Sequence, residues 1–308
     1  MEKHLDVDRA MIQLKAKGIE HIASYHGLKQ YTTWQIGGIA DIFIQPRDEE
    51  DIIKVLKFAD EEQLPLHIIG RGSNILISDH GLRGIVLALT DHFNTIQIEG
   101  KKVRADAGAL IKDVVYQSAE QGLAGLEFAE GIPGSIGGGL IMNAGAYGGY
   151  LSDCIEMIIC CDRSGQQINL HKEDAHFDYR SSIFKQRKDL IILKAIFLMD
   201  KDNPKVIREK IDVFHEKRHK RQPLELPSAG SVFKNPPGLS VAQIIESVGA
   251  KGWRVGDAQI STKHSNFIVN LGNATCQDVL DLIEKVRQAV KVEYGINLET
   301  EILVLGNQ

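Results

Sequence analysis

The stretch GIPGSIGGGLIMNAGAYGG, residues 131–149, contains eight glycines among nineteen residues and no charged side chain. Glycine inside regular structure lowers stability by roughly 0.5–1 kcal/mol relative to alanine, so this density indicates that a bare backbone is needed. The usual need is a ligand, most often a phosphate, that lies against main-chain N–H groups. A flexible linker is the alternative, but linkers lack buried-type residues such as Ile132, Ile136 and Met142. We therefore expect an ordered, ligand-facing loop and strand.

The bulk composition describes an ordinary globular chain. Its 308 residues are enough for two or three folded units, and its 43% hydrophobic residues can fill their cores. A formal net charge of -5 argues against nucleic acid as the main partner. No apolar run approaches the ~20 residues of a membrane-spanning helix and no signal peptide is recognisable, so we expect a cytoplasmic protein without a membrane partner. The cysteines lack metal-site spacing and are expected to be reduced core thiols: Cys154, Cys160, Cys161 and Cys276.

Hydrophobic periodicity predicts an α+β protein. Helices are expected at 5–18, 48–63, 111–121, 204–221, 240–248 and 277–294. Strands are expected at 31–44, 64–69, 75–77, 84–89, 95–98, 102–107, 155–161, 167–170 and 190–198, and near 258, 267 and 302. The polar segment Lys201-Asp202-Asn203-Pro204 marks a boundary. We therefore divide the chain into an N-terminal helical segment (1–29), an α+β domain (30–200, with lobes of about 30–90 and 91–200) and a small α/β domain (201–308).

A second glycine-rich loop, Gly70-Arg71-Gly72-Ser73-Asn74, stands between two predicted strands. The Rossmann dinucleotide fingerprint requires a third glycine and a following helix. Here Ile75 occupies the third position and a strand follows, and Met142 breaks the same pattern in the longer stretch. If the two loops bind a dinucleotide, their N–H groups must close on one pyrophosphate in a non-Rossmann arrangement.

Two short motifs resemble catalytic signatures. His215-Glu216-Lys217-Arg218-His219 matches the zincin pattern H-E-x-x-H, but its cations would surround a Zn²⁺ ion, so we expect no metal site and favour a solvated or phosphate-facing basic helix. Ser231-Val232-Phe233-Lys234 matches S-x-x-K, which requires a helix. Pro236 and Pro237 follow at once and disfavour a helix, so a plain turn is an equal reading of the motif alone.

Two further charged positions stay open on residue type alone. Arg180 lies in the loop Tyr179-Arg180-Ser181-Ser182, where it can face solvent or clamp an anion. Glu301 and Glu299 alternate before a terminal strand and share one face of it, for which solvent exposure is the ordinary reading.

Together these stretches resemble one family. Its motifs match Gly70–Asn74, Gly131–Gly149, Tyr179–Ser182, Ala229–Pro236 and Glu299–Glu301, in order, over about residues 28–306. The chain is similar to UDP-N-acetylenolpyruvoylglucosamine reductases, also called UDP-N-acetylmuramate dehydrogenases, in the shorter subclass that lacks a substrate-covering insertion. The resemblance implies a two-lobed FAD-binding domain of the p-cresol methylhydroxylase/vanillyl-alcohol-oxidase type, followed by a small α/β substrate domain.

The resemblance also implies a reaction and its residues. The family passes a hydride from NADPH to FAD and then to the enolpyruvyl group of a UDP-sugar, in peptidoglycan precursor synthesis. It assigns the proton donor to Ser231, and the stabilisation of the charged intermediate to Arg180 and Glu301. We expect non-covalent FAD, since the Gly70–Asn74 loop contains no histidine or cysteine that could tether it.

The resemblance assigns the ligand contacts as follows. Expected FAD contacts are Gly70, Arg71, Gly72, Ser73, Asn74, Ile75, Ala107, Gly108, Pro133, Gly134, Ser135, Gly137, Gly138, Asn143, Ala144 and Gly145. Lys234 and Asn235 are expected to contact the UDP-sugar enolpyruvyl ether, and Arg218 its phosphates or those of NADPH. Tyr147 is the candidate to close over the nucleotide. The alternative functions are an FAD-dependent oxidase of another alcohol or sugar on the same fold, and a non-catalytic nucleotide-binding module. The sequence makes no prediction of the oligomeric state.

Overall fold

The structure, a computed structural model, describes residues 5–306. It divides into two compact units that are each discontinuous in sequence. Unit 1 comprises the described residues up to Tyr25, Asp41–Arg71 and Gly84–Lys217; unit 2 comprises His26–Ala40, Gly72–Arg83 and the described residues from Arg218 onward. These units follow different boundaries from those expected at 29/30 and 200/201. The functional division into 1–29, 30–200 and 201–308 stays a prediction.

The first sheet has the strand order β1-β2-β5-β3. Its strands are β1 (Ile22–Gly27), β2 (Ile39–Ile44), β3 (Leu66–Ile69) and β5 (Leu82–Ala88). β3 and β5 run parallel, in register from Leu66↔Ile85 to Ile69↔Ala88. β5 is nearly continuous in buried residues, as expected for a strand that is covered on both faces.

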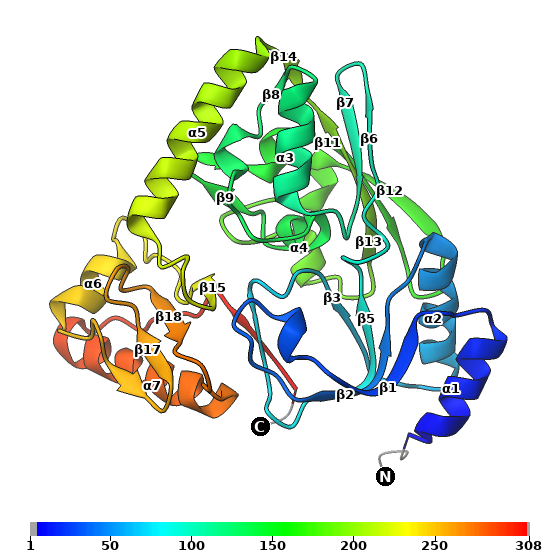
Figure 1. The fold of residues 1–308 in the computed structure, drawn as a ribbon, viewed down its shortest axis with the longest axis horizontal. Coiled ribbons are helices and arrows are strands. Elements are labelled where there is room, and N and C mark those ends of the chain that lie inside the picture. The colour runs from blue at the N-terminus through cyan, green and yellow to red at the C-terminus, as the bar shows by residue number, and fades with distance from the viewer. Residues whose placement is uncertain (1–4, 307–308) are drawn as a thin grey trace. The chain divides into compact units, whose positions relative to one another are not determined.

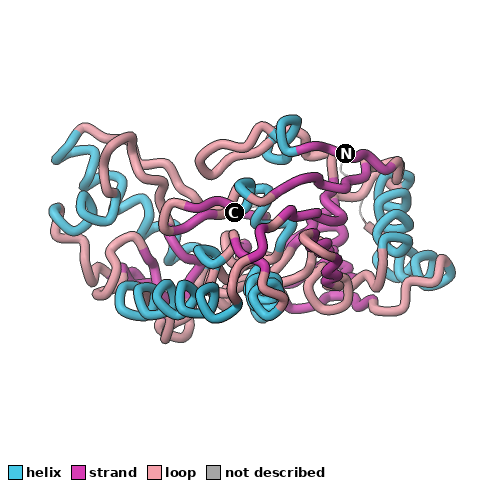
Figure 2. Tube along the Cα trace, turned by 90° about the horizontal axis from the view of Figure 1, so that it is seen from above, coloured by secondary structure: helices cyan, strands magenta, loops and turns pink. Residues whose placement is uncertain are grey.

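Two helices, α1 (Val7–Ala16) and α2 (Glu49–Glu61), accompany this sheet. Each begins at an aspartate whose carboxylate accepts a backbone N–H: Asp6 from Arg9 at 3.0 Å, and Asp48 from Asp51 at 2.9 Å. Such N-caps contribute about 1 kcal/mol each. The two helices lie beside each other, joined by an ion pair between Arg9 and Glu62 (Figures 1 and 2).

The second sheet of unit 1 is five-stranded, antiparallel and ordered β12-β11-β13-β7-β6. Its strands are β6 (Ile96–Glu99), β7 (Lys102–Asp106), β11 (Ile155–Cys161), β12 (Gln167–His171) and β13 (Ile191–Leu198). Helices α3 (Ile111–Glu120) and α4 (Ile136–Ile141) contact this sheet at β7, and α4 also contacts β13.

Two short strand pairs and a long helix complete unit 1. The pairs are β8 (Leu123–Ala124) with β14 (Asp200–Lys201), and β9 (Gly145–Ala146) with β10 (Gly149–Tyr150). The helix is α5 (Pro204–Arg221), whose last four residues belong to unit 2.

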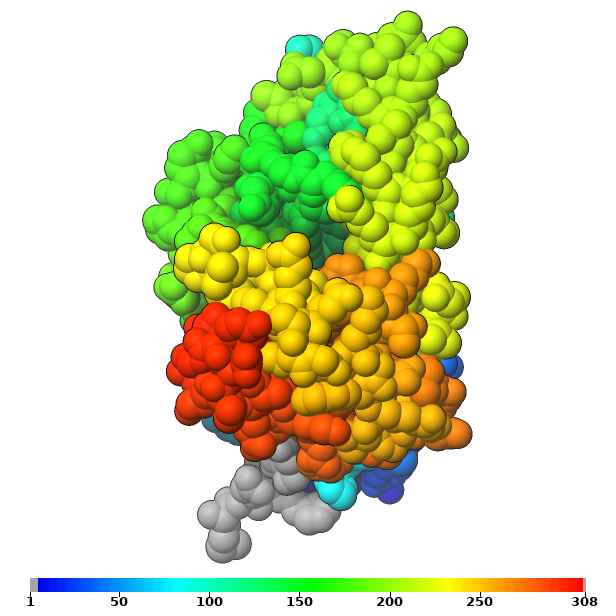
Figure 3. All heavy atoms as spheres, turned by 90° about the vertical axis from the view of Figure 1, so that its left-hand side faces the viewer, coloured from blue at the N-terminus to red at the C-terminus, as the bar shows by residue number. Residues whose placement is uncertain are grey.

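Unit 2 contains the sheet β15-β18-β17-β16. Its elements are β15 (Ser228–Ser231), α6 (Val241–Ser247), β16 (Arg254–Val255), β17 (Ala258–Ile260), β18 (Phe267–Asn270) and α7 (Cys276–Tyr294), with the parallel pair β4 (Ile75–Ile77) and β19 (Leu303–Leu305). α7 packs on β16 and β17 (Figure 1). α6 lies beside the last turn of α7 (Figure 1), where Tyr294 Oη and Ser247 Oγ are 2.7 Å apart. Figure 3 shows the surface of this C-terminal part of the chain in yellow, orange and red. Trp34 is fully buried here, and its indole N–H donates to Ile268 O at 2.8 Å.

The expected helices and most expected strands are present within a few residues of their predicted bounds. The prediction of a strand at 31–44 is wrong for residues 31–38, because the strand β2 begins only at Ile39. Residues 29–31 form a 3₁₀ turn, and the buried Thr32 hydroxyl donates to Ile36 O at 2.9 Å. The glycine-rich stretch 131–149 holds the helix α4 as well as the short strands β9 and β10, so the expectation of a loop and strand missed this helix. Further 3₁₀ turns lie at Glu127–Ala129, Leu151–Asp153, Lys172–Ala175 and Ile183–Lys185.

All four cysteines are free in the structure; Cys160, Cys161 and Cys276 are buried, whereas Cys154, expected in a core, is half-buried. Burial raises the pKa of Cys160 and of Cys161 to about 12. No helix in residues 5–306 combines the length and apolar character required to cross a bilayer.

Candidate functional site

Within unit 1, the start of the Gly70–Asn74 loop lies next to the glycine-rich stretch 131–149, at Gly70 and Ser135. A Cβ atom on Gly70 would lie 2.0 Å from Ser135 Oγ, so only glycine fits there without a shift. Ser135 is buried and caps α4, because its hydroxyl accepts the Gly138 N–H at 3.4 Å. The two loops predicted to share one ligand therefore contact each other.

The turn that follows β7 joins the same cluster. The Gly137 N–H donates to Ala107 O at 2.8 Å, and the Ile136 N–H donates to Ala109 O at 2.8 Å. A Cβ atom on Gly137 would lie 3.0 Å from the Ala107 Cβ. The structure thus places the predicted cofactor residues Ala107 and Gly108 against the start of α4.

Several N–H groups of the predicted cofactor residues have no acceptor. Within residues 5–306, the N–H groups of residues 71–74, Gly134 and Ser135 donate no hydrogen bond. Gly72 is also buried, has a φ of +68°, and leaves no room for a Cβ atom, which would lie 2.0 Å from Tyr31 O. Because buried N–H groups are normally paired, the two buried donors of unit 1, Gly134 and Ser135, fit an anionic group such as a phosphate.

Arg180 contacts the end of the glycine-rich stretch. Its Nη2 donates to Gly145 O at 3.3 Å, and the Asn143 side-chain amide donates to Asp178 O at 3.2 Å. Arg180 has a φ of +51°, in a tight turn closed by hydrogen bonds between Asp178 and Ser181 in both directions. A non-glycine residue rarely adopts this conformation, and such strain concentrates at functional sites. Unit 1 therefore brings the predicted catalytic arginine to the predicted flavin-ring residues.

Ser231 and Glu301 meet in unit 2. The Glu301 N–H donates to Val232 O at 2.7 Å, one residue beyond Ser231. The side-chain amide of Asn74, a predicted FAD contact, donates to Glu301 O at 3.1 Å. The predicted proton donor and the predicted catalytic carboxylate thus lie on adjacent paired segments. Asn266, which no sequence motif singled out, hydrogen-bonds to the segment that follows Ser231.

Two of the predicted nucleotide-binding residues, Tyr147 and Arg218, contact other side chains of the protein. Tyr147 stacks on Phe214 of α5 with 4.8 Å between ring centroids. Arg218 is 7% exposed, and its Nη1 donates to Gln222 Oε1 at 3.0 Å. Both side chains are therefore held in place within their own units.

The side chains of Lys234 and Asn235 also interact with other groups of the protein. The Lys234 ammonium lies 3.0 Å from the Glu299 carboxylate, so an anionic ligand would compete with this ion pair. Asn235 Oδ1 accepts the Val241 N–H at 3.0 Å at the start of α6. A substrate contact by the Asn235 side chain must leave this bond intact or replace it.

In unit 1, the first histidine of the H-E-x-x-H motif, His215, contacts a buried glutamate. His215 Nδ1 lies 3.0 Å from Glu130 Oε1, and Tyr116 Oη lies 3.5 Å from the same oxygen. Glu130 is 3% exposed and directly precedes the glycine-rich stretch. Within the described residues no group of three or more histidine, cysteine, aspartate or glutamate side chains could hold a metal ion. His215 therefore anchors α5 to the start of that stretch.

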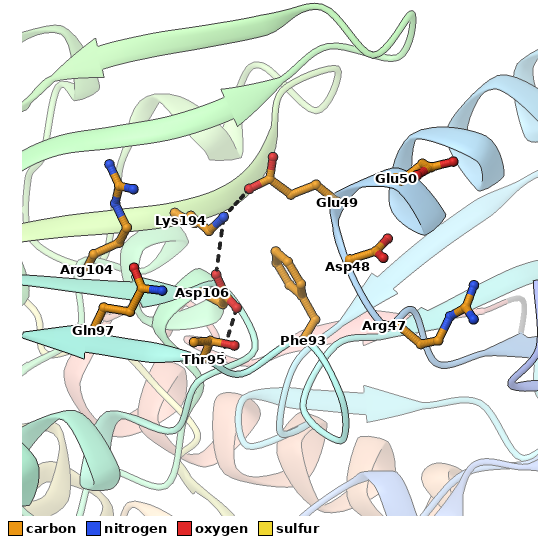
Figure 4. A pocket seen from close by; sticks show the side chains of 10 residues that line it. All are labelled: Arg47, Asp48, Glu49, Glu50, Phe93, Thr95, Gln97, Arg104, Asp106 and Lys194. Carbon is orange, nitrogen blue, oxygen red and sulfur yellow. Dashed lines mark hydrogen bonds and ion pairs between the residues drawn. The ribbon is translucent and has the colours of Figure 1, made fainter.

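A cavity of about 500 Å³ in unit 1 contains none of the predicted site residues (Figure 4). It is lined by Arg47, Asp48, Glu49, Glu50, Phe93, Thr95, Gln97, Arg104, Asp106 and Lys194. Burial raises the pKa of Asp106, against the effect of the Thr95 N–H and the Lys194 charge. Lys194 pairs with Glu49, which ties β13 to the first turn of α2.

Comparison with known proteins decides the family. Residues 222–305 match the family model described as UDP-N-acetylenolpyruvoylglucosamine reductase, C-terminal domain, and residues 40–171 match an FAD binding domain. The UDP-N-acetylenolpyruvoylglucosamine reductase of Moorella thermoacetica is 45% identical over 279 residues, 91% of each chain. That of Clostridium novyi is 40% identical over 308 residues, 100% of this chain and 99% of its own. The chain belongs to the UDP-N-acetylenolpyruvoylglucosamine reductase family.

Solved structures agree with this assignment. The crystal structure of the Thermus caldophilus UDP-N-acetylenolpyruvylglucosamine reductase aligns with a TM-score of 0.80 at 33% identity, over 93% of this chain and 98% of that one. A berberine bridge enzyme variant aligns with a TM-score of 0.50 at 13% identity, over 63% of this chain and 44% of that one, which shows the fold alone. The predicted α+β fold with an FAD-binding domain is thus confirmed for this reductase family member.

Proposed function

We propose that this chain reduces UDP-N-acetylglucosamine enolpyruvate to UDP-N-acetylmuramate with NADPH, through non-covalently bound FAD. The observation that carries the proposal is the contact between Arg180 and Gly145, because it joins the predicted catalytic arginine to the flavin-binding stretch. The family membership supports the same reaction.

The unpaired N–H groups of Arg71, Gly134 and Ser135 in unit 1 are suited to hold phosphate oxygens of FAD. The Asn143 side chain is occupied by Asp178 O and by the Ser152 N–H, so Asn143 would face the flavin ring through its backbone. When bound, FAD supplies hydride acceptance from NADPH and hydride donation to the enolpyruvyl group.

The protein's own residues stabilise the negative charge that hydride addition creates and supply the proton that completes the reaction. Hydride addition at the terminal carbon leaves negative charge on the carbon alpha to the carboxylate and on the carboxylate itself. Arg180 is always cationic and stabilises this charge electrostatically, and Glu301 hydrogen-bonds to the charged intermediate. The Ser231 hydroxyl donates its proton to the alpha carbon, which completes the lactyl ether. Serine is a weak acid, but the receiving carbon is strongly basic.

Four residues are proposed to bind the nucleotide parts of the substrates. Tyr147 offers an aromatic face, since it is 40% exposed and already held by Phe214. Arg218 and Lys234 offer positive charge to phosphate oxygens, and Asn235 offers an amide. Because this chain belongs to the shorter subclass, we propose that Tyr147 closes over the nucleotide in place of the missing insertion.

We further propose that the reaction takes place in the cytoplasm and supplies a peptidoglycan precursor, on which cell shape and division depend. Depletion of the protein in its own host tests this role. The expected result is accumulation of the enolpyruvyl nucleotide with loss of the rod or coccal outline before lysis. Unchanged nucleotide pools on depletion would contradict it.

Product analysis tests the reaction itself. Purified protein, FAD, NADPH and the enolpyruvyl nucleotide should give a product heavier by two hydrogens, with one NADPH consumed for each product formed. NADPH consumption should stop when the nucleotide is left out. Consumption of oxygen with an alcohol or sugar, without need for NADPH, would instead identify an oxidase on the same fold.

A further inference from the structure

The segment that follows Ser231 leaves the regular ladder of its sheet. β15 pairs with β18 at Ser228↔Val269 and at Ser231↔Phe267, with a register shift between the two pairs. Phe267 is the first residue of β18, and the chain turns away before it. Phe233, two residues beyond Ser231, therefore has no strand residue of β18 opposite its backbone.

The side chain of Asn266 takes the place of that missing strand. Its Oδ1 accepts the Phe233 N–H at 3.0 Å, and its Nδ2 donates to Phe233 O at 2.9 Å. The backbone O of Asn266 also accepts the Val232 N–H at 2.9 Å. Since the Phe233 N–H is a donor and its carbonyl an acceptor, only one orientation of the amide satisfies both bonds.

These bonds are buried and lie between the two predicted catalytic residues. Asn266 is 5% exposed and Phe233 is 1% exposed. On its other side, Phe233 forms a bridge with Thr300, the residue that precedes Glu301. Lys234 N–H donates to Glu299 O at 2.9 Å and completes this pairing. A displacement of Phe233 would therefore move Ser231 and Glu301 relative to each other.

We propose that Asn266 is a positioning residue for proton delivery: its side-chain amide fixes the Phe233 backbone and thereby sets Ser231 against Glu301. The inference rests on the proposed roles of these two residues. It predicts that Asn266 affects reoxidation of the flavin by substrate, where Ser231 acts, and leaves reduction by NADPH unaffected.

The substitution Asn266→Asp tests this most sharply. Aspartate has the same shape and keeps the acceptor for the Phe233 N–H, but its second oxygen faces the Phe233 carbonyl, and two acceptors repel. A misplacement of this kind lowers a rate by about 10- to 100-fold. We expect such a loss in reoxidation by the enolpyruvyl nucleotide, measured by anaerobic stopped-flow absorbance, with an unchanged rate of flavin reduction by NADPH.

Asn270→Asp is the matched control. Asn270 lies in the same strand and is 1% exposed, and its Nδ2 donates to Trp34 O at 2.9 Å, in a bond that does not involve the serine segment. We expect this variant to lose thermal stability as Asn266→Asp does, while the ratio of the two half-reaction rates stays that of the wild type. An equal change of that ratio in both variants would overturn the proposal.

A double variant separates positioning from a general structural role. If Asn266 acts through Ser231, then Asn266→Asp adds no further loss in a Ser231→Ala background. Additive losses would overturn the proposal. Should Asn266→Asp fail to fold, Asn266→Gln keeps the amide but displaces it by one methylene, and must show the same selective loss. A wild-type protein that NADPH does not reduce would instead refute the proposed function, and that result is independent of any Asn266 variant.

Discussion

Gly230 permits the shift in register that precedes Ser231. It has a φ of +73°, a conformation that glycine adopts without penalty, whereas a residue with a Cβ atom is strained there by roughly 1–2 kcal/mol. The register shift between Ser228 and Ser231 coincides with this residue. The side chain of Ser231 is therefore aimed by a local backbone feature that belongs to its own strand.

Replacement of Ser231 by alanine tests its assignment as the proton donor. Loss of a general acid typically slows the step that it serves by about 10²–10⁴-fold. We expect Ser231→Ala to be reduced by NADPH at the wild-type rate and to be reoxidised by the enolpyruvyl nucleotide more slowly by that factor. Anaerobic rapid-mixing absorbance resolves the two half-reactions.

Ser228→Ala, on the same short strand, provides the control and should leave both rates unchanged. Equal losses of both rates in Ser231→Ala would argue against the proton-donor role. They would point instead to damage of the binding site.

At the scale of elements, α4 shows where local propensity failed as a guide. Three consecutive glycines disfavour a helix by roughly 1 kcal/mol each, so the sequence favoured a loop. Tertiary contacts override this preference, because a Cβ atom on Gly139 would lie 2.7 Å from Leu151 and 2.9 Å from Ile111. The glycines thus allow close packing within unit 1 in addition to approach by a ligand.

The sequence was sufficient to predict long helices with periodic apolar residues. It was not sufficient to predict where a side chain hydrogen-bonds to a backbone segment in place of a neighbouring strand. Helices such as α2 and α7 follow from apolar spacing and capping residues alone. Asn266 carries no such signal, since its role depends on a strand that begins only one residue later, at Phe267. The roles of Arg180 and Ser231 came from family resemblance, while the contact between Arg180 and Gly145 came from the structure.

The connection between β17 and β18 gives unit 2 a dependence on pH. Burial, assisted by the positive charge of Arg221, lowers the pKa of His264, and its Nδ1 accepts the Asn266 N–H at 3.3 Å. The unfolded chain takes up a proton near pH 6.5, whereas the folded chain does so only at lower pH. Stability is therefore full above about pH 6.5 and falls as the pH drops toward the folded-state pKa.

We expect His264→Gln to flatten this part of the stability profile. Thermal unfolding between pH 5 and pH 8 measures it, since the wild type should lose more stability on acidification than the variant does. Parallel profiles for the two proteins would show that His264 does not carry the effect.

At the scale of the whole molecule, the predicted functional residues are divided between the two units. Unit 1 holds Arg180, Tyr147 and most of the expected FAD contacts, whereas unit 2 holds Ser231 and Glu301. The family matches follow the chain in the same order, with an FAD binding domain over 40–171 and the reductase C-terminal domain over 222–305. The composition of the chain argued against nucleic acid as the main partner but could not identify this reaction.

The visible absorbance of the flavin under anaerobic conditions tests the central claim most directly. The purified protein with FAD should lose its flavin band when NADPH is added, and should regain it when the enolpyruvyl UDP-sugar follows, with UDP-N-acetylmuramate as the product. A protein that binds no FAD, or whose reduced flavin is not reoxidised by that nucleotide, would contradict the account.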